Sequence, residues 1–252
     1  MKIVALVNHK GGVAKTTSTY NLAYLKAKQG FRVLMVDLDP QASLTISAGL
    51  DPIADELEGH NIISVFDGIA PASCCWSVDA SEQQSLYIIP SEINLAQTEM
   101  KLITATLREL KLKRALKKLE DRFDYAFIDC PPQLGMLTIN ALMAADEIII
   151  PCTAEYLSYT GLEALLDTVD AYQADPDLNP DLKVDGAVIT RYDGRISDQQ
   201  DVVELVSKKI PVLGIIKQLA DVNREVYKGK PVTMTHPRSA AAKEYRKIAD
   251  QI

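Results

Sequence analysis

A glycine pair flanked by two lysines lies near the start of the sequence, where it is placed to bind phosphate. The segment Asn8–Thr17 reads NHKGGVAKTT and follows a short apolar run. Glycines let a loop close so that its N–H groups, with the positive end of a following helix, surround a phosphate. In such a loop Lys15 reaches the β- and γ-phosphate oxygens, and Thr16 offers its hydroxyl to Mg²⁺. The residues expected to bind the nucleotide are Lys10, Gly11, Gly12, Val13, Ala14, Lys15, Thr16 and Thr17.

This loop departs from the ordinary phosphate-binding pattern G-x-x-x-x-G-K-[ST], because His9 and Ala14 occupy its two glycine positions. It carries an additional lysine, Lys10, five residues before Lys15. Ala14 adds one methyl group, so we expect it to shift nucleotide affinity without abolishing the loop. The alternative is a glycine turn between a strand and a helix with no ligand, and two further motifs weigh against it.

Aspartates follow two other apolar runs. Asp37 and Asp39 belong to Val36–Ser43, and Asp129 precedes a double proline in Phe127–Pro132. In doubly wound sheets, ligands bind at the carboxyl ends of the strands, so carboxylates there face the γ-phosphate. Asp129 is expected to hold Mg²⁺ through its water shell, and the loop after it is suited to sense the γ-phosphate. The alternative for Asp37 and Asp39 is an acidic turn without chemistry.

Together these motifs resemble the superfamily of ParA, MinD and the nitrogenase iron protein, with K-G-G-x-x-K-[ST], D-x-D-P-Q and D-x-P-P segments. The resemblance covers essentially the whole chain and is strongest to small chromosomal ParA proteins of the Soj type. It implies ATP and Mg²⁺ as ligands, with Asp39 positioning or activating the attacking water and Asp37 supporting the metal site. Ala14 departs from the usual Gly of the loop. Lys217-Gln218 stands where relatives often carry Pro-Arg near the adenine, so the residues that hold the base stay open. Further segments that carry the resemblance are Gly135–Ala144, Ile150–Tyr156, Thr190–Arg195 and Gly229–Val232.

The resemblance also implies a function. Lys10 would cross a two-fold interface to the phosphates of a partner's ATP, so that Lys10, Lys15 and Asp39 form the catalytic set. The ATP-bound homodimer would bind non-specific DNA, and a ParB-like partner would stimulate slow hydrolysis to segregate a chromosome or plasmid. Such a protein would be cytoplasmic and associated with the nucleoid. The candidate DNA contacts are Arg195, Arg224 and Lys228.

Apolar runs that alternate with helix-like segments predict the fold class, a three-layer α/β/α domain with a mostly parallel twisted sheet. The runs are apolar on both faces, as expected for strands covered by helices on each side. At 252 residues the chain is expected to form one domain, 1–252. Asp51–Gly59 and Pro71–Gln84 are predicted surface loops. The expected strands are Lys2–Val7, Arg32–Asp37, Leu86–Ile89, Tyr125–Asp129, Glu147–Ile150, Lys183–Thr190 and Pro211–Ile216, and the expected crossover helices include Lys15–Gln29 and Ser197–Lys209.

Composition restricts the partners. The formal charge is −7, which argues against a surface that is basic throughout, so any DNA contact must be a local patch. The four cysteines form no Cys-x-x-Cys pair, so neither a zinc site nor a disulfide framework is expected. No apolar run approaches the length of a membrane span, and we expect no stable membrane insertion.

Three alternatives remain at this point. A MinD-like ATPase that positions a membrane or protein cargo would use Ser239–Ile252 as a membrane-touching helix, whereas we expect that segment to dock on the sheet. A nitrogenase-type electron carrier needs cysteines around a cluster, and the cysteine positions do not resemble that pattern. A non-catalytic protein that binds ATP as a structural ligand is opposed by Lys15, Thr16, Asp39 and Asp129.

Overall fold

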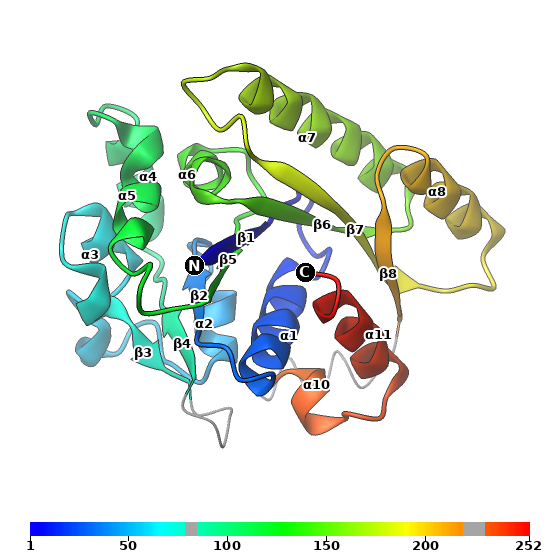
Figure 1. The fold of residues 1–252 in the computed structure, drawn as a ribbon, viewed down its shortest axis with the longest axis horizontal. Coiled ribbons are helices and arrows are strands. Elements are labelled where there is room, and N and C mark those ends of the chain that lie inside the picture. The colour runs from blue at the N-terminus through cyan, green and yellow to red at the C-terminus, as the bar shows by residue number, and fades with distance from the viewer. Residues whose placement is uncertain (79–84, 219–229) are drawn as a thin grey trace.

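A single eight-stranded sheet organises the chain in the computed structural model, which describes residues 1–78, 85–218 and 230–252. The strand order is β3-β4-β2-β5-β1-β6-β7-β8, and β3 alone runs antiparallel to its neighbour (Figure 1). The central strands β2, β5, β1 and β6 therefore end at a common edge. The strands are β1 (Lys2–Leu6), β2 (Val33–Asp37), β3 (Trp76–Ser77), β4 (Leu86–Ile89), β5 (Tyr125–Asp129), β6 (Glu147–Thr153), β7 (Lys183–Tyr192) and β8 (Val212–Lys217).

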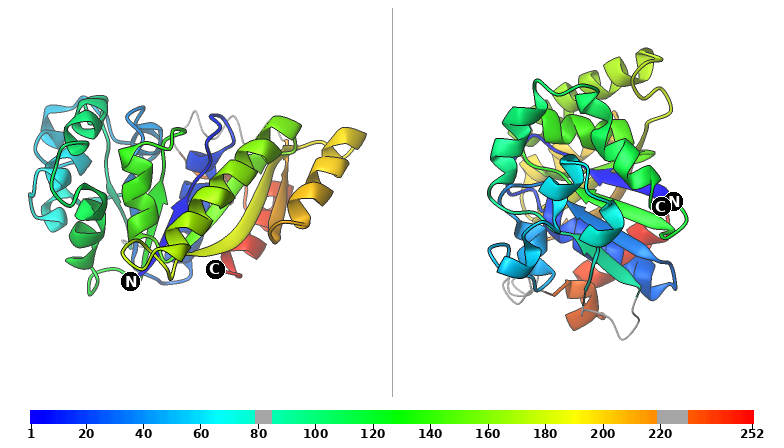
Figure 2. Two further views of the ribbon diagram at one scale, coloured as in Figure 1. Left: turned by 90° about the horizontal axis from the view of Figure 1, so that it is seen from above. Right: turned by 90° about the vertical axis from the view of Figure 1, so that its left-hand side faces the viewer.

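Helices cover both faces of this sheet and complete three layers (Figures 1 and 2). One layer holds α1 and α11, which pack on each other, with the short helix α10 beside them. The opposite layer holds the helices from α4 to α8. The bounds are α1 (Lys15–Lys28), α2 (Ser43–Ser47), α3 (Ile62–Phe66), α4 (Leu95–Leu102), α5 (Lys111–Lys117), α6 (Met136–Ala144), α7 (Tyr156–Ala174), α8 (Ser197–Ser207), α10 (Val232–Thr235) and α11 (Ala240–Ala249), with 3-10 turns at Asp55–Leu57, Pro71–Cys74 and Arg108–Leu110.

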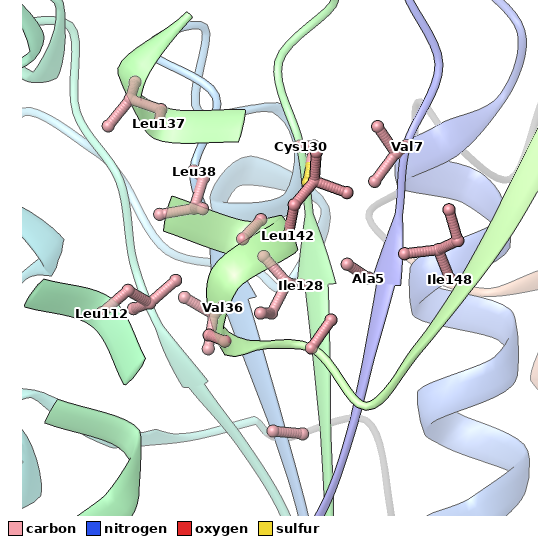
Figure 3. Packing of buried hydrophobic residues seen from close by; sticks show 14 of the residues in the cluster. Ala5, Val7, Val36, Leu38, Leu112, Ile128, Cys130, Leu137, Leu142 and Ile148 are labelled. Atoms are coloured by element: carbon pink, nitrogen blue, oxygen red, sulfur yellow. The ribbon is translucent and has the colours of Figure 1, made fainter. Parts of the chain in front are cut away.

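Two hydrophobic cores lie on opposite faces of the sheet, and alternate residues of each strand enter them. In β1, Ala5 packs into one core and Val4 and Leu6 into the other, and all three are fully buried. Figure 3 shows the core beneath α6, where Leu142 meets strand residues such as Ile128. Because each fully buried aliphatic side chain stabilises the fold by about 1.5–3 kcal/mol, strands that are apolar on both faces require a helical layer on each.

The expected fold class is confirmed, and seven expected strands match β1, β2 and β4 to β8 within a few residues. One expectation was partly wrong: Pro71–Gln84 is not loop throughout, because its described part contains a 3-10 turn and the strand β3. Trp76 and Ser77 pair with β4 over two residues, which is too short for a periodic pattern. The Trp76 indole N–H also donates to the His60 carbonyl at 2.8 Å, a contact between residues distant in sequence.

The terminal helix α11 docks on the sheet, as expected. Its Tyr245 is fully buried, and the Tyr245 hydroxyl lies 3.1 Å from the Ser18 hydroxyl in α1. Ser239 caps the helix by accepting from the Ala242 N–H. Over the described residues, none of the helices has the length and apolar character needed to cross a bilayer.

Candidate nucleotide site

The glycine loop connects the end of β1 to the start of α1, which is the position a phosphate-binding loop requires. Gly12 has a φ of 74°, and Ala14, the N-cap of α1, has a φ of 64°. A Cβ atom at Gly11 or Gly12 would meet nothing within 4 Å, so the left-handed backbone at Gly12, and not a close contact, is the reason for glycine there. The loop backbone and the first turn of α1 therefore form a cradle suited to an anion.

Ala14→Gly is expected to stabilise the chain by about 1 kcal/mol, because a left-handed backbone strains an L-residue with a Cβ atom and does not strain glycine. The measurement is the free energy of unfolding in urea. Ala23→Gly, in the buried interior of α1, is the matched control and should destabilise by at least about 1 kcal/mol. Equal destabilisation by both variants would show that Ala14 is not strained.

Lys15 lies inside this cradle with only 7% of its surface exposed. Its ammonium donates to the carbonyls of Asn8 and Lys10, each at 3.2 Å. Burial lowers the pKa of Lys15, and the Asp129 carboxylate opposes that shift. A buried cation balanced by nearby carboxylates, Asp129 first and then Asp39, provides the positive charge that phosphate oxygens need.

Two fully buried carboxylates lie beside each other where β2 and β5 end, because Asp37 pairs in register with Asp129. Asp129 accepts from the Thr16 hydroxyl at 2.6 Å. Burial is the main cause that raises the pKa of both groups, to about 6 for Asp37, and their mutual repulsion adds to the shift at Asp129. A hydroxyl and buried carboxylates are the hard oxygen ligands that Mg²⁺ binds, and a divalent cation would offset the repulsion.

Asp37 is already engaged by its own chain. Its carboxylate accepts from the Asp39 N–H at 3.1 Å and from the N–H and hydroxyl of Thr45 at 2.9 and 2.8 Å. These bonds fix the loop that carries Asp39 between β2 and α2. The contacts favour a supporting role for Asp37 and leave Thr16 and Asp129 better placed to hold the metal.

A cleft of about 800 Å³ opens along this edge of the sheet, within the usual range for ligand pockets. The loop residues Gly11 to Thr17, apart from Val13, line it together with Asp39. Arg191, Lys217 and Gln218 also line it. Those three residues are therefore candidates for the base contacts that the sequence left open.

Three polar residues that the motifs did not single out organise the site. The Asn8 amide donates to the Pro151 carbonyl at 2.7 Å, and Asn8 Oδ1 accepts from the Lys10 N–H at 2.9 Å. The Thr190 hydroxyl donates to the Val13 carbonyl at 3.1 Å. Thr45, described above, is the third. In the sequence, Asn8 and Thr190 each follow an apolar run, whereas Thr45 has no such signal.

The structure does not bring every candidate together. Lys10 lies at the mouth of the loop, and its ammonium contacts Glu155 and, at 3.3 Å, the Ser158 hydroxyl, both at the start of α7. Arg195 is 89% exposed and forms an ion pair with Asp193 at 2.6 Å, away from the cleft lining. The other candidate DNA contacts, Arg224 and Lys228, lie outside the described residues.

Comparison with known proteins finds relatives that match the chain over most or all of its length. A family model described as AAA domain, AAA_31, matches residues 1–184. The chain is 37% identical to the sporulation initiation inhibitor protein Soj of Bacillus subtilis, covering 100% of this chain and 98% of Soj. It is 36% identical to the chromosome-partitioning ATPase Soj of Treponema pallidum, covering 100% of this chain and 96% of that protein. A structure described as cobyrinic acid a,c-diamide synthase from Mycobacterium smegmatis, with a bound ATP analog and magnesium, superposes with a TM-score of 0.82 at 38% identity, covering 99% of this chain and 93% of the other.

Proposed function

The chain belongs to the ParA/Soj family of partition ATPases, and we propose that it is an ATP-dependent switch for segregating a chromosome or plasmid. One observation carries the proposal: Lys15, Thr16, Asp39 and Asp129 converge from three segments at the same edge of the sheet. The ATP analog and magnesium in the related synthase structure support Mg²⁺ and ATP as the ligands.

In this reading the loop N–H groups and the Lys15 ammonium bind the β- and γ-phosphates. Thr16 and Asp129 hold Mg²⁺, which when bound neutralises negative charge on the transferred phosphoryl group. Asp39, fixed by the bond from its own N–H to Asp37, orients the attacking water and accepts its proton. A switch that must stay loaded with ATP hydrolyses it slowly until a partner stimulates the reaction.

Two copies would pair face to face across their nucleotides, with Lys10 of each reaching the phosphates of the other. Tyr156 and Leu157 follow Glu155, the ion-pair partner of Lys10. Their large apolar side chains are 65% and 75% exposed and suit a surface that a second copy covers. The dimer would bind non-specific DNA through phosphate contacts, and a ParB-like protein would stimulate hydrolysis and release. The protein would thus work in the cytoplasm, on the nucleoid.

The description of the synthase structure names a different activity, but the Treponema pallidum relative, which matches over the full chain, is named a chromosome-partitioning ATPase and supports partitioning. A MinD-like role at a membrane has less support, because the buried Tyr245 ties α11 to the sheet. Among cargoes, DNA is therefore the first to test.

The test is DNA binding by fluorescence anisotropy with a non-hydrolysable ATP analog, with the oligomeric state followed by ultracentrifugation. Wild type should form dimers that bind any sequence, and Lys10→Ala should lose both dimers and DNA binding. For roughly four phosphate contacts, affinity should fall about 10²-fold between 50 and 200 mM salt.

Lys113→Ala, which removes an exposed lysine on α5, is the control and should behave as wild type. Dimers that ignore DNA at low salt would contradict the DNA step. Binding of those dimers to anionic liposomes would favour the MinD-like alternative instead.

A further inference from the structure

We propose that Glu155 is a positioning residue that holds Lys10 within its own chain and so opposes the pairing of two copies. The inference rests on the proposed function in one respect, that Lys10 must reach a partner's phosphates. It adds the start of α7 to the functional parts of the molecule, which until now were the phosphate loop and the aspartates.

The contact joins residues 145 positions apart. The Lys10 ammonium forms an ion pair with the Glu155 carboxylate and donates to the Ser158 hydroxyl at 3.3 Å. Ser158 is fully buried and shares a 2.6 Å hydrogen bond with Thr153, so the acceptor site at the start of α7 is fixed. One of the two acceptors of the ammonium, Ser158, is therefore held in place by its own buried hydrogen bond.

Backbone restraints keep the two partners close. Asn8 ties the glycine loop to the end of β6, because its side-chain amide donates to the Pro151 carbonyl while its side-chain Oδ1 accepts from the Lys10 N–H. Since β6 leads within a few residues to Glu155, the same asparagine places both ends of the ion pair. Only the side chains of Lys10 and Glu155 need to move for the contact to open.

To reach a partner's phosphates, the Lys10 side chain must turn away from Glu155 of its own chain, so each subunit is expected to break its contact when a dimer forms. The side chains are 34% and 57% exposed, and exposed pairs of this kind stabilise weakly. Two such contacts are expected to weaken the dimer by about two- to thirtyfold in dissociation constant, which corresponds to about 0.4–2 kcal/mol at 1.4 kcal/mol per tenfold. A penalty of this size is small enough for ATP to overcome.

Glu155→Gln removes the charge and keeps the shape, so it should tighten the dimer formed with a non-hydrolysable ATP analog and Mg²⁺ by about two- to thirtyfold. The measurement is the dissociation constant by sedimentation velocity. Because salt screens exposed ion pairs, the advantage over wild type should shrink as ionic strength rises. Glu163→Gln is the matched control, because it removes the carboxylate that pairs with Lys209 further along α7. It should leave the dissociation constant of the dimer unchanged.

A second measurement does not depend on dimers. In single chains without nucleotide, the rate at which an amine reagent labels Lys10, followed by mass spectrometry, should rise about 1.4- to fivefold in Glu155→Gln and not in Glu163→Gln. Unchanged labelling together with an unchanged dissociation constant would overturn the proposal.

A weaker dimer in Glu155→Gln would overturn it too, since Glu155 would then be a contact made across the interface. If wild type forms no dimer with the analog, the dimer of the proposed function is wrong. The labelling result then decides alone whether Glu155 holds Lys10.

Discussion

Lys15→Met is expected to lower ATP hydrolysis by at least about 10²- to 10³-fold, the usual loss when a preorganised charge on the reacting group is removed. The substitution keeps a long side chain in the cradle but removes the ammonium that is buried beside Asp129. Two carbonyls, those of Asn8 and Lys10, also lose their donor. The measurement is phosphate release at saturating ATP, together with the affinity for a fluorescent ATP analog.

Lys28→Met is the matched control, because Lys28 is the exposed last residue of the same helix. It lies about 20 Å along the axis at 1.5 Å per residue, and its loss should leave hydrolysis within twofold of wild type. Unimpaired turnover in Lys15→Met would contradict the assignment of the loop as the phosphate site.

Asp39→Ala should separate binding from chemistry. Loss of a group that orients water and accepts a proton lowers the rate by about 10²- to 10⁴-fold. ATP binding should persist or strengthen, since Asp39 adds negative charge beside the buried pair Asp37 and Asp129. The variant is therefore expected to accumulate as an ATP-bound dimer on DNA. Single-turnover kinetics measure the rate of hydrolysis, and sedimentation in the presence of ATP measures the ATP-bound dimer.

The control for Asp39→Ala must remove the same kind of local hydrogen bond at a position away from the site. Asp39 accepts from the N–H two residues ahead, that of Gln41, at 2.9 Å, and Asp175 makes the same bond to Asp177 at 2.9 Å. Asp175 follows the last residue of α7. The first turn of α7 lies near the cleft, whereas its last turn lies at the opposite end of the strands. Asp175→Ala should keep full turnover. A variant Asp39→Ala that hydrolyses normally, or that cannot bind ATP, would refute the role assigned to Asp39.

If both results hold, the site works as a switch with separable parts. Lys15 and the loop would be needed for the nucleotide to bind productively, whereas Asp39 would be needed only for release. Glu155 would then tune how much nucleotide is needed to form the dimer, without entering the chemistry.

The sequence by itself determined the features that depend on neighbouring residues. The glycines of the loop, the aspartates at strand ends and the apolar runs with two buried faces are local patterns, because backbone curvature and strand burial are set within a few residues. The location of Asp37 and Asp129 at the carboxyl ends of strands also follows from the sequence, whereas their pairing in register depends on β2 lying beside β5. The roles of the site residues stay predictions for the variants above to test.

Only the tertiary structure decided which distant groups meet. The bonds from Thr45 to Asp37, the placement of Lys217 and Gln218 on the cleft wall and the two-residue strand β3 have no periodic signal in sequence. The ion pair of Lys10 with Glu155 spans 145 residues and depends on β6 lying beside β1. Such contacts are set by strand order and register, which arise when the two cores pack, so local spacing cannot specify them.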